Sequence, residues 1–146
     1  MFTLHKVLLT LHILTAIVTI GWLSMQAMLM PRAIRSGNAG AVRLGASMAE
    51  RIGPIASVVF LLGLWLVGVS TDAELKDPWI GAAMLLFIVA LVNGAVFIGR
   101  TEKRAAERLE AGQAAPEEAK RVAMLGGINA LLLLVIVFLM VAKPGN

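Results

Sequence analysis

The chain has 146 residues, of which 59% are hydrophobic and only 15% are charged, and its mean hydropathy is +0.86. This composition is too apolar for a soluble domain of this length, which needs a larger share of polar residues to cover its surface. The net charge of +4 invites a nucleic-acid-binding function, but the basic residues are divided between separate loops, so we exclude nucleic acid as a partner.

Four uncharged runs account for most of the chain when His12 is counted as neutral. They are Val7 to Pro31, Ile52 to Thr71, Pro78 to Gly99 and Val122 to Ala142. Each reaches the ~20 residues that a helix needs to cross the hydrocarbon core of a bilayer. We therefore predict an all-α fold, a single four-transmembrane-helix bundle over residues 1–146 with approximate spans 5–31, 52–71, 78–100 and 120–142.

The basic residues predict how this bundle lies in the membrane. Ten of the thirteen Lys and Arg lie in the loops after the first and third spans, and only Lys6, Lys76 and Lys143 lie at the other end. Because cytoplasmic loops carry an excess of Lys and Arg, we expect both loops in the cytoplasm and both termini on the outer side. The expected location is a bacterial inner membrane, with the lipid bilayer as the first partner.

The first span carries a continuous polar stripe. The spacing of its members keeps side chains on one face of a helix. A face that meets lipid should be apolar, so we expect this stripe to point into the bundle and to meet any ligand. The stripe consists of His5, His12, Thr15, Thr19, Trp22 and Gln26.

The later helices show clear boundaries. The third is predicted to continue beyond the membrane through Arg100 to Glu110, a segment that mixes both signs of charge. Pro116 is followed by two acidic residues and suits the first turn of the fourth helix, where proline needs no N–H partner. We therefore expect the charged loop after the third span to be largely helical.

His12 is the principal candidate for chemistry, because ionisable residues inside membranes are commonly functional. It would serve as an axial haem ligand, a metal ligand or a proton-transfer group, and the alternative is a histidine hydrogen-bonded across the bundle. Trp22 lies on the same face and is the second candidate for contact with a cofactor. His5 lies at the water interface and is a weaker candidate, so our metal candidates are His12 and His5.

The two histidines cannot bind one metal ion from the same face of one helix. They are seven residues apart, which separates them by ~10.5 Å along the axis. A bis-histidine site would need a second copy of the chain, and His12 alone would need Met, water or a partner subunit opposite it. With no cysteine in the chain, thiolate ligands are excluded.

A second polar group is expected toward the cytoplasmic side. One polar residue from each span falls roughly 6–11 Å from the inner boundary, and small residues flank the last two of them. We interpret the group as a hydrogen-bonded structural clamp, with a transport or substrate site as the alternative. Its members are Gln26, Ser57, Asn93 and Asn129, of which Asn93 and Asn129 are expected to touch.

Three short motifs in the first helix carry a family resemblance: Leu11-His12-Ile13-Leu14, Gly21-Trp22 and Pro31-Arg32. They resemble predicted integral membrane proteins of the domain-of-unknown-function 2269 type, and more distantly the copper-resistance D and HemJ protoporphyrinogen oxidase families. The HemJ likeness implies that His12 binds haem b. In that family a lysine in a later helix also takes part, and the third run here contains none, so whether the chain is an enzyme stays undecided.

Three functions remain open. The first is a membrane protein that holds haem, a related porphyrin or a metal through His12. The second is a structural or accessory subunit, within a homo-oligomer or a larger membrane complex, whose polar stripe only packs against neighbours. The third is a small copper or small-molecule permease, although the runs contain no Asp, Glu, Lys or Arg to bind a charged substrate.

Overall fold

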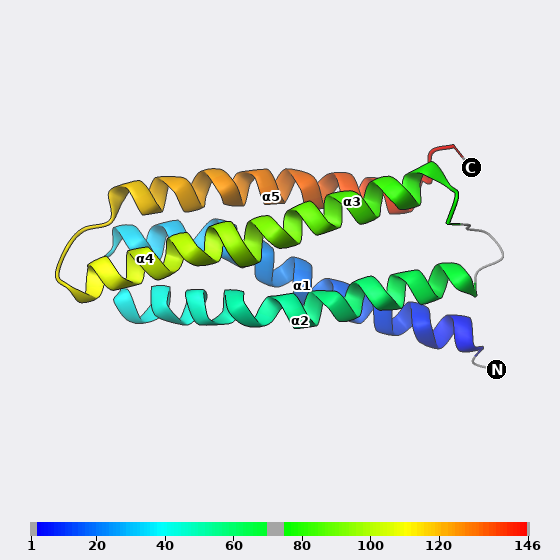
Figure 1. The fold of residues 1–146 in the computed structure, drawn as a ribbon, viewed down its shortest axis with the longest axis horizontal. Coiled ribbons are helices and arrows are strands. Elements are labelled where there is room, and N and C mark those ends of the chain that lie inside the picture. The colour runs from blue at the N-terminus through cyan, green and yellow to red at the C-terminus, as the bar shows by residue number, and fades with distance from the viewer. Residues whose placement is uncertain (1–2, 70–74, 146) are drawn as a thin grey trace.

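The computed structural model describes residues 3–69 and 75–145. Four helical rods lie side by side, and no strand occurs in those two ranges (Figure 1). All four are long and apolar enough to cross a membrane, so the predicted four-helix membrane bundle is confirmed. The elements are α1 (Leu4–Arg35), α2 (Ala39–Gly68), α3 (Pro78–Val92), η1 (Asn93–Ile98), α4 (Gly99–Glu110) and α5 (Pro116–Ala142).

Local sequence sets where the helices begin and end. The Thr3 hydroxyl accepts the backbone N–H of Lys6 at the start of α1, and Asn38 caps α2 by accepting the N–H of Ala41. Between α1 and α2, Gly37 turns the chain at a φ of 73°, which glycine adopts without strain. Pro116 opens α5, as its position in the sequence predicted.

The third rod is one continuous helix whose middle is a π-helix. Elements α3, η1 and α4 follow one another without a break, and η1 covers Asn93–Ile98. Its last part, α4, is the charged extension predicted from the sequence. The sequence analysis expected an ordinary α-helix through residues 93–98, so the π-turn is a new feature, of a kind that often marks functional sites.

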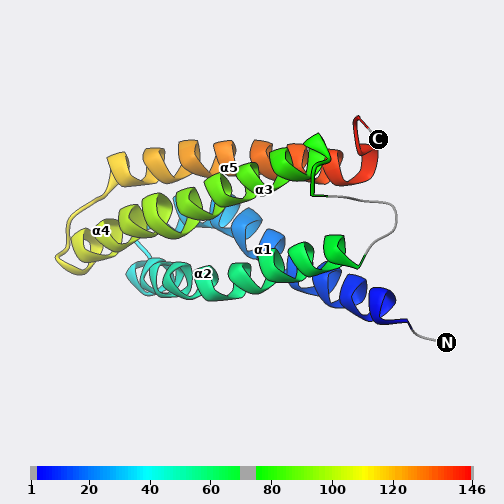
Figure 2. The ribbon, with the colours of Figure 1, turned by 45° about the vertical axis from the view of Figure 1, so that its right-hand side comes forward.

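The two ends of the bundle differ in content. We call the end that holds residues 3 and 145 the terminal end, and the end with the α1–α2 and α4–α5 turns the basic end (Figure 2). The larger core cluster lies at the basic end, where Met30, Ile34, Val42 and Ile98 pack against alanines of α4 and α5. At the terminal end α2 and α3 make few contacts, so the rods leave a space between them.

The outward faces of all four rods are apolar. Ile17, Leu61, Leu85 and Leu134 are 61–69% exposed, although each lies in the middle of an uncharged run. Large apolar side chains on every side of a bundle have no favourable partner in water and suit a hydrocarbon environment. The protein is therefore an integral, multi-pass membrane protein in contact with the lipid bilayer.

Candidate functional site

The polar stripe of α1 faces the interior, as predicted. Thr19 and Gln26 are fully buried, and His5, His12 and Trp22 are half-buried. The residues between them, such as Ile17 and Val18, are exposed on the opposite face. The stripe therefore runs along the inside of the bundle, and its two halves meet different surroundings.

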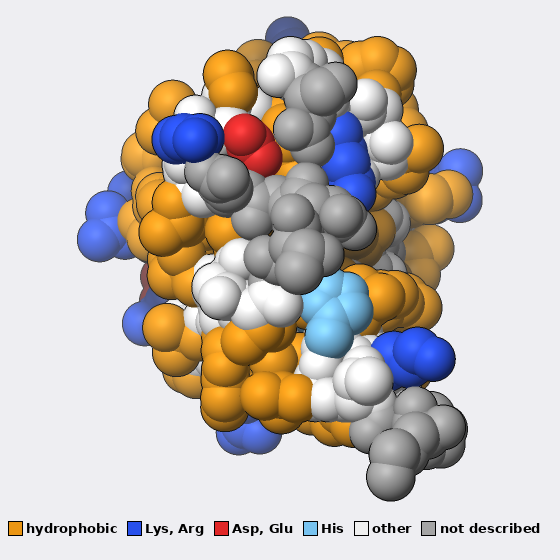
Figure 3. All heavy atoms as spheres, turned by 90° about the vertical axis from the view of Figure 1, so that its right-hand side faces the viewer, with side chains coloured by type: hydrophobic (Ala, Val, Ile, Leu, Met, Phe, Trp, Pro, Cys, Tyr) orange, Lys and Arg blue, Asp and Glu red, His pale blue; other side chains and the backbone are white. Residues whose placement is uncertain are grey.

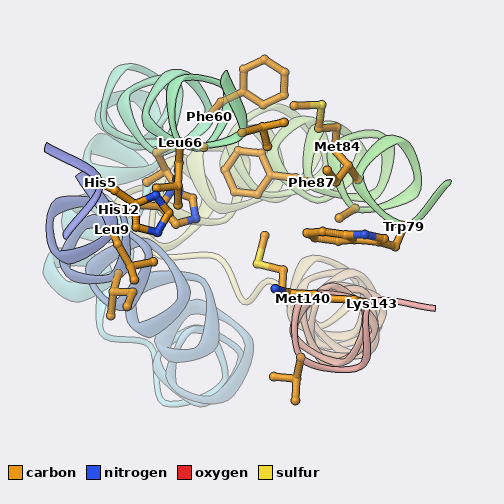
Figure 4. A pocket seen from close by; sticks show the side chains of 17 residues that line it. His5, Leu9, His12, Phe60, Leu66, Trp79, Met84, Phe87, Met140 and Lys143 are labelled. Atoms are coloured by element: carbon orange, nitrogen blue, oxygen red, sulfur yellow. Dashed lines mark hydrogen bonds between the residues drawn. The ribbon is translucent and has the colours of Figure 1, made fainter. Parts of the chain in front are cut away.

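A cleft of about 490 Å³ opens at the terminal end. All four rods line it, with α1 and α2 on one wall and α3 and α5 on the other (Figure 4). Histidine atoms reach the surface at this end of the molecule (Figure 3). Most lining side chains are apolar or aromatic, and the polar ones are His5, His12, Trp79 and Lys143. We call this space the terminal cleft.

His12 is held in one orientation on the wall of the terminal cleft. Its Nδ1 lies 3.2 Å from the backbone carbonyl oxygen of Val59 on α2. A carbonyl can only accept, so Nδ1 carries the hydrogen and Nε2 of the neutral ring keeps its lone pair. Gly63 makes the approach possible, because a Cβ there would lie 3.1 Å from His12 Cε1. The ring thus keeps one nitrogen for a ligand.

The other two residues proposed around His12 fall in different places. His5 lines the terminal cleft with His12, whereas Trp22 does not. Trp22 packs beside the core cluster of Leu23, Leu133 and Ile136. Ten residues of helix separate Trp22 from His12 along the bundle, and the contact of Trp22 with a cofactor stays a prediction.

The described residues contain no group of three or more His, Cys, Asp or Glu side chains that could hold a metal ion. His5 and His12 therefore have no carboxylate or third histidine beside them in those ranges. Among the described residues, the soft donors on the same cleft are the thioethers of Met84 and Met140. The geometry gives no support to a site for a bare metal ion.

Trp79 and Lys143 form the opposite rim of the terminal cleft. The Lys143 ammonium lies 5.9 Å from the centre of the Trp79 ring, which is within cation–π range. Trp79 is only 9% exposed, and its indole N–H has no hydrogen-bond partner in the described part of the chain. The sequence analysis did not predict this pairing, because Trp79 lies at the start of α3 and Lys143 caps the end of α5.

The predicted contact between Asn93 and Asn129 is present. Asn93 Nδ2 donates to Asn129 Oδ1 at 2.9 Å and lies 3.0 Å from the carbonyl oxygen of Leu125. Asn129 Nδ2 donates in turn to the carbonyl oxygen of Ala90 at 3.2 Å. These bonds join α5 to the third rod at the start of the π-turn, which suits the structural clamp.

Ser57 does not belong to this cluster. It is exposed, and its hydroxyl donates to the carbonyl oxygen of Gly53 one turn earlier in α2. Equal depth in the membrane was the basis for including Ser57, but depth does not determine which face of a helix a side chain occupies. The expectation of one clustered polar side chain from each span was therefore wrong for α2.

Gln26 pairs with a residue that the sequence analysis did not consider, Glu102. The Gln26 Nε2 atom lies 3.5 Å from both carboxyl oxygens, and Glu102 is 0% exposed. Glu102 lies beyond the run Pro78–Gly99, beside Gly45 in the charged first part of α2. No ion pair to Glu102 exists within the described ranges. Burial raises the pKa of its carboxyl to about 8, and the hydrogen bond from Gln26 lowers this pKa by a smaller amount.

A pattern in α4 could have identified Glu102. Ile98, Glu102, Ala105 and Leu109 recur at steps of four, three and four, the spacing of one buried helix face. An acid at this spacing shares the inward face of the helix with its apolar neighbours. The sequence analysis looked for ionisable residues only inside the uncharged runs, so this acid lay outside its search.

Comparison with known proteins identifies the family. The family model described as "Predicted integral membrane protein (DUF2269)" matches residues 6–144, and the chain belongs to this family. No curated protein and no solved structure matches the chain. The more distant likeness to the copper-resistance D and HemJ families stays a prediction of the sequence.

Proposed function

We propose that this member of the DUF2269 family binds a flat, largely apolar ligand of the porphyrin class, haem b included, in the terminal cleft. The observation that carries the proposal is the hydrogen bond between His12 Nδ1 and the Val59 carbonyl oxygen. Histidines that bind metals commonly use their second nitrogen in this way, which fixes the ring and leaves the other nitrogen for the ligand.

The shape and lining of the terminal cleft support the same proposal. Its volume of about 490 Å³ falls within the ~300–1,000 Å³ typical of small-molecule sites. Phe60 of α2 and Met84 and Phe87 of α3 add apolar surface to the two walls of the terminal cleft, and Figure 4 labels them together with His12. An iron porphyrin held here would supply redox chemistry, while this chain would supply the axial nitrogen and the apolar walls that exclude water.

The experiment is reconstitution of the purified chain with haemin in detergent, followed by absorption spectroscopy. Wild type is expected to shift the Soret band of free haemin, His12→Ala to lose this shift, and His5→Ala to keep it, because the Nδ1 bond to Val59 orients only the His12 ring. His12→Gln should also lose the shift of the Soret band, since an amide can replace the hydrogen bond to the Val59 carbonyl oxygen but is a poor haem ligand. Equal spectra for wild type and His12→Ala, or a wild-type spectrum identical to that of free haemin, would favour the accessory-subunit alternative.

We also propose that the terminal end faces outward from a bacterial inner membrane. The support is the partition of Lys and Arg, ten of which lie at the basic end. The chain has no cysteine, so a single introduced thiol reports its own side. Leu4→Cys should react with an impermeant maleimide on intact cells, and Gln113→Cys only after permeabilisation. The reverse pattern would place the cleft on the cytoplasmic side.

A further inference from the structure

The rim of the terminal cleft contains a hydrogen-bond donor that nothing in the described chain satisfies. Trp79 Nε1 lacks an acceptor, and water does not replace one, because nine-tenths of the residue is shielded from solvent. An indole nitrogen can only donate, and a buried donor without an acceptor is costly and rare in native proteins. Because Trp79 lines the terminal cleft, the missing acceptor is expected there.

A positive charge lies beside that donor. The Lys143 ammonium contacts the Trp79 ring at 5.9 Å and lines the same cleft. Lys143 has no ion pair with any residue that the structure describes. It also occupies the left-handed region at φ 44°, which is uncommon for a residue with a side chain, as the C-cap of α5. The described part of the chain therefore places an exposed positive charge beside the Trp79 ring without an acid paired to it.

We propose that Trp79 and Lys143 form the seat for an anionic group, carboxylate or phosphate, of an amphipathic ligand whose apolar body lies in the terminal cleft. An anionic oxygen accepts the indole N–H and the ammonium together, which satisfies both groups with charge-assisted hydrogen bonds. The inference rests on the proposed function in taking the terminal cleft as a ligand site. It does not depend on iron or on His12.

The rest of the lining determines what the body of the ligand can be. Leu9, Ile80, Met84, Phe87 and Met140 surround the space between the rim and His12. These side chains offer no hydrogen bonds, so a sugar or nucleotide would lose its hydration without replacement. A ligand with one acidic end and a hydrocarbon or aromatic body fits both parts, and Figure 4 shows Trp79 and Lys143 on the wall that faces His12.

The test compares acids with their neutral esters. The full chain in neutral detergent is titrated with protoporphyrin IX and with its dimethyl ester, and binding is followed by porphyrin fluorescence. In a second titration, oleate and methyl oleate compete with the bound porphyrin. The acid of at least one pair is expected to bind wild type about tenfold more tightly than the ester, the order of a charge-assisted hydrogen bond. Equal binding of acid and ester in both pairs, or no binding of either acid, overturns the proposal.

Variants identify which residues produce the preference. Lys143→Gln and Trp79→Phe should each reduce the acid-to-ester ratio to about threefold or less, because one removes the charge and the other removes the N–H while keeping an aromatic ring. Lys143→Arg should restore it. Lys120→Gln, an exposed lysine at the basic end, is the matched control and should leave the ratio unchanged. An undiminished ratio in both rim variants overturns the proposal.

Two further arms separate the related hypotheses. Metal-free protoporphyrin cannot be ligated by His12, so His12→Ala should keep the acid preference even if it abolishes the haem spectrum. Failure of the His12 proposal and failure of this one are therefore distinguishable.

In nanodiscs, competition by phosphatidylglycerol but not by phosphatidylcholine would identify a lipid phosphate as the anionic group, and no competition by either would identify a free acid. Competition by phosphatidylcholine to the same degree overturns the role of charge.

Discussion

The terminal and basic ends of this bundle use polar side chains in opposite ways. At the basic end, Asn93 bonds to Asn129 and Gln26 contacts Glu102, so interior polar groups face one another across packed helices. At the terminal end, His12 keeps one nitrogen unused and the Trp79 N–H lacks an acceptor beside a 490 Å³ cleft. The basic end thus brings its polar side chains together across packed helices, although Gln26 Oε1 and Glu118 Oε2 keep no partner among the described residues, whereas the terminal end places polar groups beside an open space.

Small residues explain why the basic end closes. A Cβ on Gly126 would lie 2.7 Å from the Cα of Ala27, and one on Gly94 would lie 3.2 Å from Asn129 Nδ2. Close backbone approach brings short amide side chains within hydrogen-bonding distance, as is usual in membrane helix pairs. The lining of the terminal cleft contains Phe60, Trp79 and Phe87 instead, which hold the helices apart. Under the proposed function, the basic end supplies stability and the terminal end supplies binding.

The largest expected effect concerns the one carboxyl buried at the basic end. The pKa of Glu102 is about 8 in the folded protein, compared with 4.5 for an ordinary glutamate. The folded state therefore retains a proton that the unfolded state releases, and stability should fall as pH rises from about 4.5 to about 8, then level off. The loss should be roughly 3–5 kcal/mol, because each pKa unit corresponds to about 1.4 kcal/mol.

Thermal unfolding in detergent between pH 4 and 9 measures this loss. Glu102→Gln has nearly the same shape and no proton to lose, so it should remove most of the pH dependence and exceed wild-type stability at pH 8. Glu117→Gln, an exposed acid in the first turn of α5, is the control and should retain the wild-type slope. A wild type that grows more stable from pH 5 to pH 8 would contradict a protonated, buried Glu102.

The sequence predicted the basic end of this molecule and its terminal end to different extents. The spans, the inward stripe of α1 and the Asn93–Asn129 contact followed from hydropathy and helical spacing, because these depend on one helix or on equal depth in two. Glu102 was missed because membrane burial was sought only inside uncharged runs, although α4 packs against α2 beyond them. The π-turn at Asn93–Ile98 leaves no mark in the hydropathy pattern.

The terminal cleft was harder to predict than any single residue in it. His12 and His5 were selected as candidates from their place in the first span, and both line the cleft. The cleft itself depends on how far α1 and α2 diverge from α3 and α5, which no periodicity reports. The pairing of Trp79 with Lys143 joins residues at opposite ends of two different helices. Trp22 shares the face of His12 but not its depth, and it lies outside the lining of the terminal cleft.

A smaller effect should come from opening the basic end where α1 and α5 touch. Gly126→Ala places a methyl group against the Ala27 backbone, which cannot move aside as a flexible side chain can. We expect a loss of about 1–3 kcal/mol in the free energy of unfolding, the usual cost of overpacking, less the gain of up to ~1 kcal/mol in helix propensity. The neighbouring Gly127→Ala is the matched control, since a Cβ there meets nothing within 4 Å.

The two alanine variants also show whether the ends act independently. Both should bind porphyrin acid as wild type does, because Gly126 lies one turn from Asn129 and far along α5 from Lys143. A lower melting temperature for Gly126→Ala with unchanged ligand affinity would support separate roles for the two ends. Equal melting temperatures for both variants would mean that α1 and α5 do not approach closely. A parallel loss of stability and affinity would instead mean that the terminal cleft depends on the contact between Gly126 and Ala27. Separating α1 from α5 at the basic end would then also move the wall that carries Lys143 away from His12.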